Sequence, residues 1–130
     1  KNMFIKFILN KPYKHIIRDE VNNMKKYEVI VSKNAEDDLE NIISYLRYDL
    51  AGDIIADKYK ILFKQKLKEL EYIAGSMSIL DEKLTGYDKI RKVNVRNYII
   101  FYTVDEEKDK VLVVRIGHAF MDWEKYLKDE

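Results

Sequence analysis

Three stretches in the C-terminal half of the sequence read as strands, and their closeness in sequence favours an antiparallel arrangement. They cover residues 90–96, 98–104 and 111–116, and each has the β-branched and aromatic composition of a strand. Parallel neighbours need a crossover of a dozen or more residues, whereas these runs are separated by residue 97 and by the charged stretch DEEKDK. The sequence therefore predicts a three-stranded antiparallel meander.

An amphipathic helix is predicted upstream, after a short strand at residues 27–31. We expect Asn34 to be its N-cap, with Asp37 completing a capping box, and Gly52 to end it. Its apolar stripe consists of Leu39, Ile42, Ile43, Leu46 and Leu50. This spacing is typical of a helix that packs one face on a core.

A second, longer helix is predicted directly after the first, capped by Asp53 and closed by Gly75. Its inner stripe would be Ile55, Tyr59, Leu62, Phe63, Leu67, Leu70 and Ile73. So short a break between two helices predicts an antiparallel helical hairpin. We interpret both stripes as core and not as a cofactor site.

The remaining segments complete an α+β fold. Residues 76–89 lack periodicity and are expected to form an irregular connection with a turn at Gly86. A short helix is expected at residues 122–127, anchored by Trp123. The order is an N-terminal strand, the helical hairpin, the meander and a short C-terminal helix, which predicts a hairpin packed on one face of a sheet.

Residues 1–23 do not fit this plan, and Met24 looks like a natural start. We therefore predict a domain over residues 24–130 and an N-terminal extension, residues 1–23, of unknown role. The charges are also segregated: residues 1–26 hold seven lysines and arginines, while residues 34–52 are mainly acidic. Such segregation favours one acidic and one basic face, and a basic face can meet phosphate.

The composition excludes several classes of protein. With 47% hydrophobic and 36% charged residues the chain is expected to be ordered and globular. Because it has no cysteine, disulfides and thiolate metal sites are excluded, and His15 and His118 show no metal-ligand spacing. We expect no metal and no cofactor. No run approaches the length of a membrane span, which favours a soluble cytoplasmic protein without a membrane partner.

The end of the last strand is the stretch most suggestive of chemistry. The apolar run stops at Gly117 and presents His118, and an apolar Ala-Phe-Met step follows. Histidine transfers protons near neutral pH. Arg115 and His118 would point to opposite faces of a regular strand, and we expect a bulge at Gly117 that reconciles them.

The block KIRKVNVRNYIIFYTVDEEKDKVLVVRIGHAFMDWEKYL resembles the C-terminal half of RelE/ParE-type toxins, and YEVIVSKNAEDDLENIISYL resembles their first strand and helix. The resemblance covers residues 27–127. It implies the toxin of a bacterial type II toxin–antitoxin pair, neutralised by a cognate antitoxin, as a homodimer or in a hetero-oligomer with that antitoxin. RelE-like members cut messenger RNA (mRNA) on the ribosome without metal, whereas ParE-like members poison DNA gyrase and are not nucleases.

This resemblance, together with His118, favours ribosome-dependent mRNA cleavage. His118 would transfer protons and Arg91, Arg96 and Arg115 would hold the phosphate. Nucleic-acid contacts would come from Lys83, Lys89, Lys92 and Phe120, the last as a stacking ring where many relatives carry a cation.

Alternatives stay open for each of these residues. A histidine at a strand end is more often structural, Arg91 and Arg96 would serve equally as partners of acids on the hairpin, and Phe120 suits a surface covered by antitoxin. The alternative functions are a gyrase inhibitor without nuclease activity and a detoxified relative that still binds its antitoxin.

Overall fold

The computed structural model describes residues 25–50, 52–80 and 89–128. Along the chain they form β1 (Glu28–Val31), α3 (Lys33–Ser44), a π-helical segment η1 (Tyr45–Leu50), α4 (Asp53–Ile73) and a 3-10 turn η2 (Ala74–Ser76). Three strands and a helix follow: β2 (Arg91–Val95), β3 (Tyr98–Asp105), β4 (Lys110–His118) and α6 (Trp123–Lys128). The predicted α+β order is confirmed. The expected turn at Gly86 and the expected extension at residues 1–23 lie outside the described residues.

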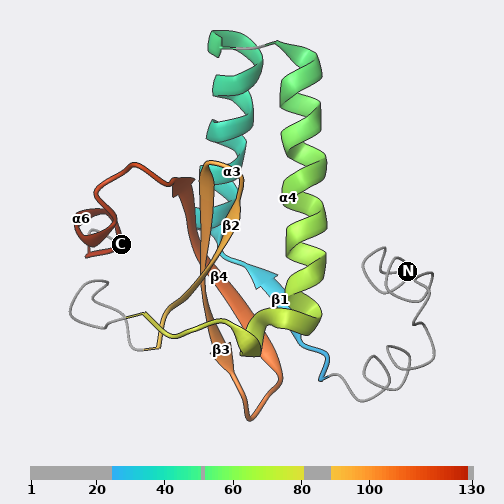
Figure 1. Ribbon diagram of the computed structural model, residues 1–130, viewed down its shortest axis with the longest axis vertical. Coiled ribbons are helices and arrows are strands. Elements are labelled where there is room, and N and C mark those ends of the chain that lie inside the picture. Colours follow the sequence, from blue (N-terminus) through green and yellow to red (C-terminus); the bar gives the residue numbers. More distant parts are fainter. Residues whose placement is uncertain (1–24, 51, 81–88, 129–130) are drawn as a thin grey trace.

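The four strands form one sheet in the order β1-β4-β3-β2 (Figure 1). The meander β2-β3-β4 is antiparallel, as predicted, and β1 joins it parallel to β4 through the pairs Glu28–Lys110 to Val31–Val113. The helices α3 and α4 stand side by side and extend beyond the sheet at the hairpin end, while α6 lies apart from them on the other side (Figure 1). The sheet therefore has covered residues on both faces.

The central strand β3 shows this most clearly, because its residues 98–102 are all buried. Tyr98, Ile100 and Tyr102 belong to the large core beneath the helical hairpin, which includes Phe63 and Leu70 of α4. Alternate residues face a second, smaller core that includes Ile99, Phe101 and Leu127. The hydroxyl of Tyr102 donates to the carbonyl of Ala74 at 2.9 Å, which ties the sheet to the end of α4.

Strand β4 contains a bulge, but not at Gly117 as expected. Tyr102 pairs with Val113 and Phe101 pairs with Arg115, so Val114 is the extra residue. Because the bulge precedes both residues, Arg115 lies opposite Phe101 and His118 lies opposite Tyr98, on different faces of the sheet. The bulge therefore does not bring Arg115 and His118 together.

Three further local expectations are corrected. The N-cap of α3 is Ser32 and not Asn34, and its hydroxyl accepts from the Ala35 N–H at 3.1 Å. The N-cap of α4 is Gly52, with φ of 88°, and Asp53 is the first helical residue. Leu50 is 65% exposed and therefore is not core.

Candidate functional site

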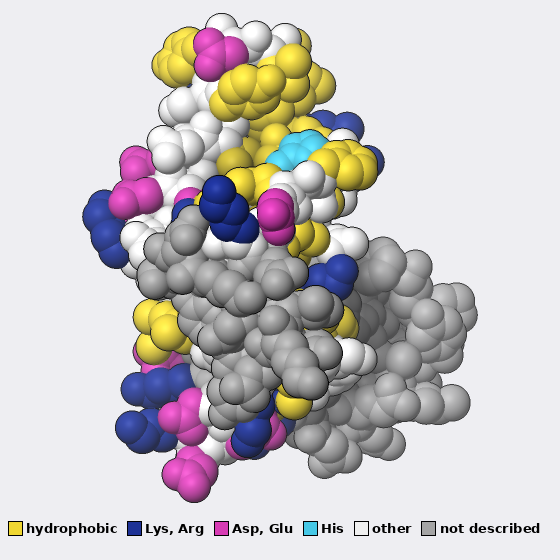
Figure 2. All heavy atoms as spheres, turned by 90° about the vertical axis from the view of Figure 1, so that its left-hand side faces the viewer, with side chains coloured by type: hydrophobic (Ala, Val, Ile, Leu, Met, Phe, Trp, Pro, Cys, Tyr) yellow, Lys and Arg dark blue, Asp and Glu magenta, His cyan; other side chains and the backbone are white. Residues whose placement is uncertain are grey.

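A pocket of about 320 Å³ opens beside His118, between α3 and the end of β4. Its apolar lining includes Ile42 of α3, Tyr45 of η1 and Tyr98 of the sheet. Met121 contributes from the segment that follows β4. Figure 2 shows the histidine surrounded by hydrophobic side chains on this face of the molecule. The site is therefore mainly apolar, with His118 at its wall.

The imidazole of His118 is held by two rings and one hydrogen bond. Its ring meets Tyr98 edge-on at 5.3 Å and the ring of Phe120 at 5.1 Å, between centroids. The Phe120 N–H donates to Nδ1 of His118 at 3.2 Å. A nitrogen that accepts carries no proton, so the neutral ring is protonated at Nε2.

The contacts of His118 belong to a longer row of aromatic rings. Tyr98 also contacts Tyr59 and Phe63 of α4, at 5.6 Å and 5.7 Å. Burial raises the pKa of the Tyr98 hydroxyl, with smaller contributions from Tyr59 and Tyr45. The row ends at Phe120, which is 84% exposed. The row of rings thus runs from the core beneath the helical hairpin to the exposed ring of Phe120.

Gly117 is explained by the helix that follows it. A Cβ at this position would lie 2.7 Å from Cη2 of Trp123 and 3.1 Å from Sδ of Met121. Trp123 is anchored by ring contacts with Phe101 at 4.3 Å and Tyr126 at 5.2 Å, which confirms its predicted role. The glycine therefore leaves room for the indole that positions α6.

Arg115 forms an ion pair with the carboxylate of Asp38. Its Nε and Nη2 donate to the two oxygens of Asp38 at 2.7 Å and 2.9 Å, and its guanidinium also lies over the Tyr126 ring. Asp38 further accepts from the Ile116 N–H at 3.0 Å and from the Tyr126 hydroxyl at 2.7 Å. The side chains of Arg115 and Asp38 are 16% and 11% exposed. This network joins α3, β4 and α6.

The ionisation of Asp38 reflects these contacts. Burial opposes the charged form, but the hydrogen bonds from Arg115, Ile116 and Tyr126 outweigh it and hold the pKa of Asp38 below 3.8. The Tyr126 hydroxyl has a raised pKa because it is buried and donates to the Asp38 carboxylate. The Asp38 carboxylate is thus ionised, and its oxygens already accept hydrogen bonds from these three residues.

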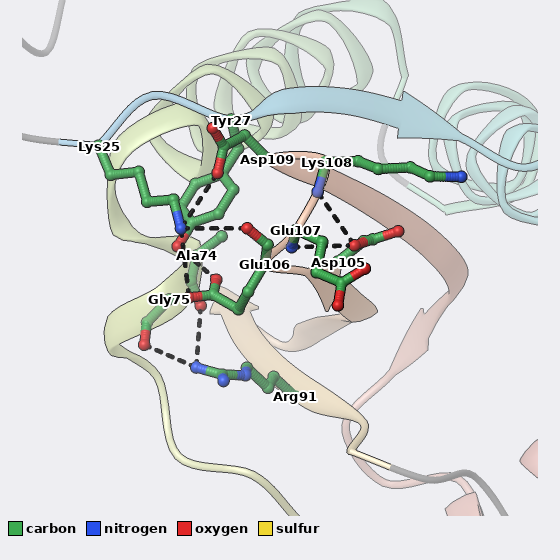
Figure 3. A network of polar contacts seen from close by, with 10 residues as sticks. All are labelled: Lys25, Tyr27, Ala74, Gly75, Arg91, Asp105, Glu106, Glu107, Lys108 and Asp109. Atoms are coloured by element: carbon green, nitrogen blue, oxygen red, sulfur yellow. Dashed lines mark hydrogen bonds and ion pairs between the residues drawn. The ribbon is translucent and has the colours of Figure 1, made fainter.

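Arg91 lies at the far end of the sheet from His118. Its Nη1 donates to the carbonyl of Gly75 at 2.7 Å, just after α4 (Figure 3). It also donates to the carbonyl of Met77 at 2.9 Å. Arg91 pairs with Tyr102, whereas His118 pairs with Tyr98. Four residues along a strand separate these two positions by about 13 Å. The structure therefore does not bring Arg91 and His118 together.

The same end of the sheet holds a further polar network, drawn in Figure 3. The Tyr27 hydroxyl donates to Glu106 at 2.7 Å, and Lys25 ion-pairs with Asp109 at 3.0 Å. Burial, followed by the bond to Glu106, raises the pKa of Tyr27. This network fixes the hairpin loop beside the first strand, remote from the pocket.

Arg96 is the predicted cation that lies at the same end of the sheet as His118. It occupies the turn between β2 and β3 with φ of 54°, and the neighbouring Asn97 accepts from the Ala119 N–H at 2.7 Å. Lys89 and Lys92 are exposed; Lys92 pairs with Phe101 and so faces the α6 side. Lys83 lies outside the described residues.

Sequence reasoning missed the residues that define the pocket on the helix side, Asp38, Asn41 and Tyr45. Asp38 stood in the acidic start of the helix, where solvated charge is the ordinary expectation. Nothing local signals its partner, because Arg115 is 77 residues away. The described parts contain no group of side chains suited to hold a metal ion. None of the helices in these parts is long and apolar enough to cross a membrane.

The sequence is similar to one family of known proteins. Residues 29–123 match the family described as the ParE toxin of the type II toxin–antitoxin system parDE. No curated protein matches the sequence significantly. The matched range begins within β1, includes the helical hairpin and the other three strands, and ends at the first residue of α6.

Solved structures resemble the fold over most of the chain. A chain of the chromosomal ParDE system from P. aeruginosa superposes with a TM-score of 0.58 at 16% identity, covering 72% of this chain and 97% of that one. The RelBE2 complex from Mycobacterium tuberculosis gives 0.51 at 18% identity, covering 74% and 94%. The RelE–RelB complex from Pyrococcus horikoshii OT3 gives 0.50 at 14%, covering 73% and 97%.

Proposed function

Because this chain belongs to the ParE toxin family of type II toxin–antitoxin systems, and so has a cognate antitoxin as its partner, we propose that it arrests growth by binding DNA gyrase and not by cutting RNA. The surface that binds the target is the pocket beside His118 together with the exposed ring of Phe120. Gyrase is a cytoplasmic enzyme, so the proposal also places the toxin in the cytoplasm.

The observation that carries this proposal is the pairing of Arg115 with Asp38. Metal-free RNA cleavage needs cations on the phosphate oxygens as negative charge develops there. Arg115 holds an ionised carboxylate with both oxygens, and its side chain is 16% exposed. Arg91 donates to main-chain carbonyls about 13 Å further along the sheet. Two of the three predicted phosphate-holding arginines are therefore engaged elsewhere.

The lining of the pocket supports the same proposal. Exposed apolar side chains near a mainly apolar pocket are typical of a protein-binding surface. Phe120, Tyr45 and Met121 are 84%, 51% and 41% exposed. Such a surface suits contact with a folded target better than contact with a phosphodiester.

Ribosome-dependent mRNA cleavage is the second candidate, and one observation favours it. His118 and Arg96 lie at the same end of the sheet, since Asn97 bonds to Ala119. In this proposal His118 transfers protons, Arg96 holds the phosphate and Phe120 stacks on a base. Lys83, Lys89 and Lys92 would contact the RNA backbone. The sequence favours this candidate, and we rank it second because Arg115 and Arg91 are engaged in other contacts.

The test uses two purified assays on the same preparation of toxin. The first measures supercoiling by gyrase, and the second measures cleavage of mRNA on programmed ribosomes by primer extension. We expect inhibition of supercoiling that is relieved by antitoxin, and unchanged mRNA. Cleavage of mRNA that is lost in His118→Gln, with supercoiling unaffected, would replace the proposal by the second candidate.

A further inference from the structure

The middle of α4 carries a dense run of positive charge. Residues 58–68 contain five lysines and no acidic residue, in a chain whose net charge is only +1. The inner residues of this stretch, among them Phe63 and Leu67, pack on the core. Four of the five lysines, Lys58, Lys60, Lys64 and Lys68, are exposed and so point away from that core.

Most of these charges have no acidic partner. Lys58, Lys60 and Lys64 are exposed and make no ion pair within the described parts of the chain. By contrast, Lys66 pairs with Glu69 at 3.1 Å. The acids on the N-terminal side of this stretch, Asp53 and Asp57, are both held by Arg47, at 2.8 Å and 2.9 Å. The exposed side of α4 therefore carries more positive than negative charge over this stretch.

The spacing of the lysines suits a regular polyanion. Lys60, Lys64 and Lys68 follow one another at intervals of four residues, so they lie on one side of the helix about 6 Å apart. Phosphates of one DNA strand are also regularly spaced, each advancing by about 3.4 Å along the duplex axis. A regular row of lysines therefore suits a regular row of phosphates.

The composition of the outer face points to backbone contacts on a duplex. The exposed residues of α4 include no arginine for bidentate contact with bases and no aromatic ring on which an unpaired base could stack. Lysines act as point charges toward phosphate and fix position without reading sequence. We propose that the lysine face of α4, formed by Lys58, Lys60, Lys64 and Lys68, binds the phosphate backbone of duplex DNA without sequence preference.

This inference deepens the proposed function, because a gyrase inhibitor acts on an enzyme that holds duplex DNA. The pocket beside His118 would contact the protein and the lysine face would contact the DNA bound to it. The DNA contact can be measured without gyrase, so the two proposals can fail separately.

The experiment measures anisotropy of a short labelled duplex of arbitrary sequence, titrated with the full chain over a range of salt concentrations. The test variant is the triple substitution Lys58→Gln, Lys60→Gln and Lys64→Gln, which removes charge but keeps helix propensity. The control, Lys33→Gln, Lys108→Gln and Lys125→Gln, removes equal charge from exposed positions outside α4. Helical content by circular dichroism verifies that both variants are folded.

Each phosphate contact contributes about −0.9 to the slope of log affinity against log salt. We expect the test variant to lower the magnitude of that slope by about 2.7 and to bind more weakly at every salt concentration, while the control stays close to wild type. The inference is overturned if wild type does not bind the duplex, or if both variants weaken equally. Loss of binding to single-stranded RNA without loss on the duplex also overturns it. Supercoiling assays on the same variants report separately on gyrase.

Discussion

The indole of Trp123 occupies the space that a side chain on Gly117 would need, with Cη2 only 2.7 Å from the position of a Cβ. Replacing Gly117 with alanine would overpack this contact, and we expect a loss of about 1 to 3 kcal/mol in the free energy of unfolding. Urea denaturation measures this loss.

The matched experiment repeats Gly117→Ala in a Trp123→Leu background. The smaller side chain leaves room for the new methyl group, so the penalty should shrink and give a coupling energy of at least about 1 kcal/mol. Equal penalties in the two backgrounds would show that the glycine serves another purpose.

Asp38 joins three elements through Arg115, Ile116 and Tyr126. The substitution Asp38→Asn leaves the part-buried guanidinium without its counter-charge, and we expect a loss of about 2 to 3 kcal/mol in the free energy of unfolding at neutral pH. The neighbour Asp37, whose ion pair with Lys33 is exposed, provides the control. Asp37→Asn should change stability by less than about 0.5 kcal/mol.

The same carboxylate predicts a pH dependence. Because the pKa of Asp38 is lower in the folded state than its ordinary 3.8, its contribution is present above the unfolded pKa and is lost as the pH falls through the folded one. Stability measured by denaturation between neutral and strongly acidic pH should therefore fall less steeply below about pH 4 in Asp38→Asn than in wild type. Parallel acid limbs would contradict the assignment.

Arg91 is expected to be structural. Its guanidinium donates to carbonyls at the C-terminal end of α4, where the helix dipole favours a cation. We expect Arg91→Met to destabilise the fold by about 1 to 2 kcal/mol and Arg91→Lys to recover part of that loss. Growth inhibition, compared at equal amounts of folded protein, should not change. A stable Arg91→Met variant that has lost toxicity would instead support a phosphate-holding role.

Phe120 is expected to matter for binding and not for folding. Its ring is 84% exposed, so Phe120→Ala should change the free energy of unfolding by less than about 0.5 kcal/mol. At the centre of a binding surface the same change should weaken gyrase binding by about tenfold or more. Leu112→Ala, at a 41% exposed residue on another part of the sheet, is the control. Surface plasmon resonance with immobilised gyrase measures the affinity of both variants. If Phe120→Ala binds gyrase as tightly as wild type does, Phe120 is not part of the binding surface.

The elements of the fold could be predicted because each depends on a local period. The stripe of α4 and the alternation in β2 appear directly in the sequence. The bulge could not be predicted, because the run VLVVRI is apolar toward both faces and alternation does not reveal an extra residue at Val114. The place of β1 beside β4 likewise depends on long-range pairing.

The cap of α3 and the partner of Arg115 could not be predicted for a related reason. Ser32 and Asn34 are both good cap residues, and the choice of Ser32 follows from a tertiary contact, its hydroxyl donating to the Val114 carbonyl at 3.1 Å. The residue type led us to predict that Arg115 holds a phosphate anion. Only the fold reveals that the anion is Asp38, and this contact changes the preferred function of the whole site.

The most direct test of the central claim is pulse-labelled synthesis of DNA and protein in cells, minutes after the toxin is induced without its antitoxin. A gyrase inhibitor stops DNA synthesis first, while translation continues, and this is the result we predict. If protein synthesis collapses first and DNA synthesis follows later, the target is the translation machinery, and His118 with Arg96 becomes the site of RNA cleavage.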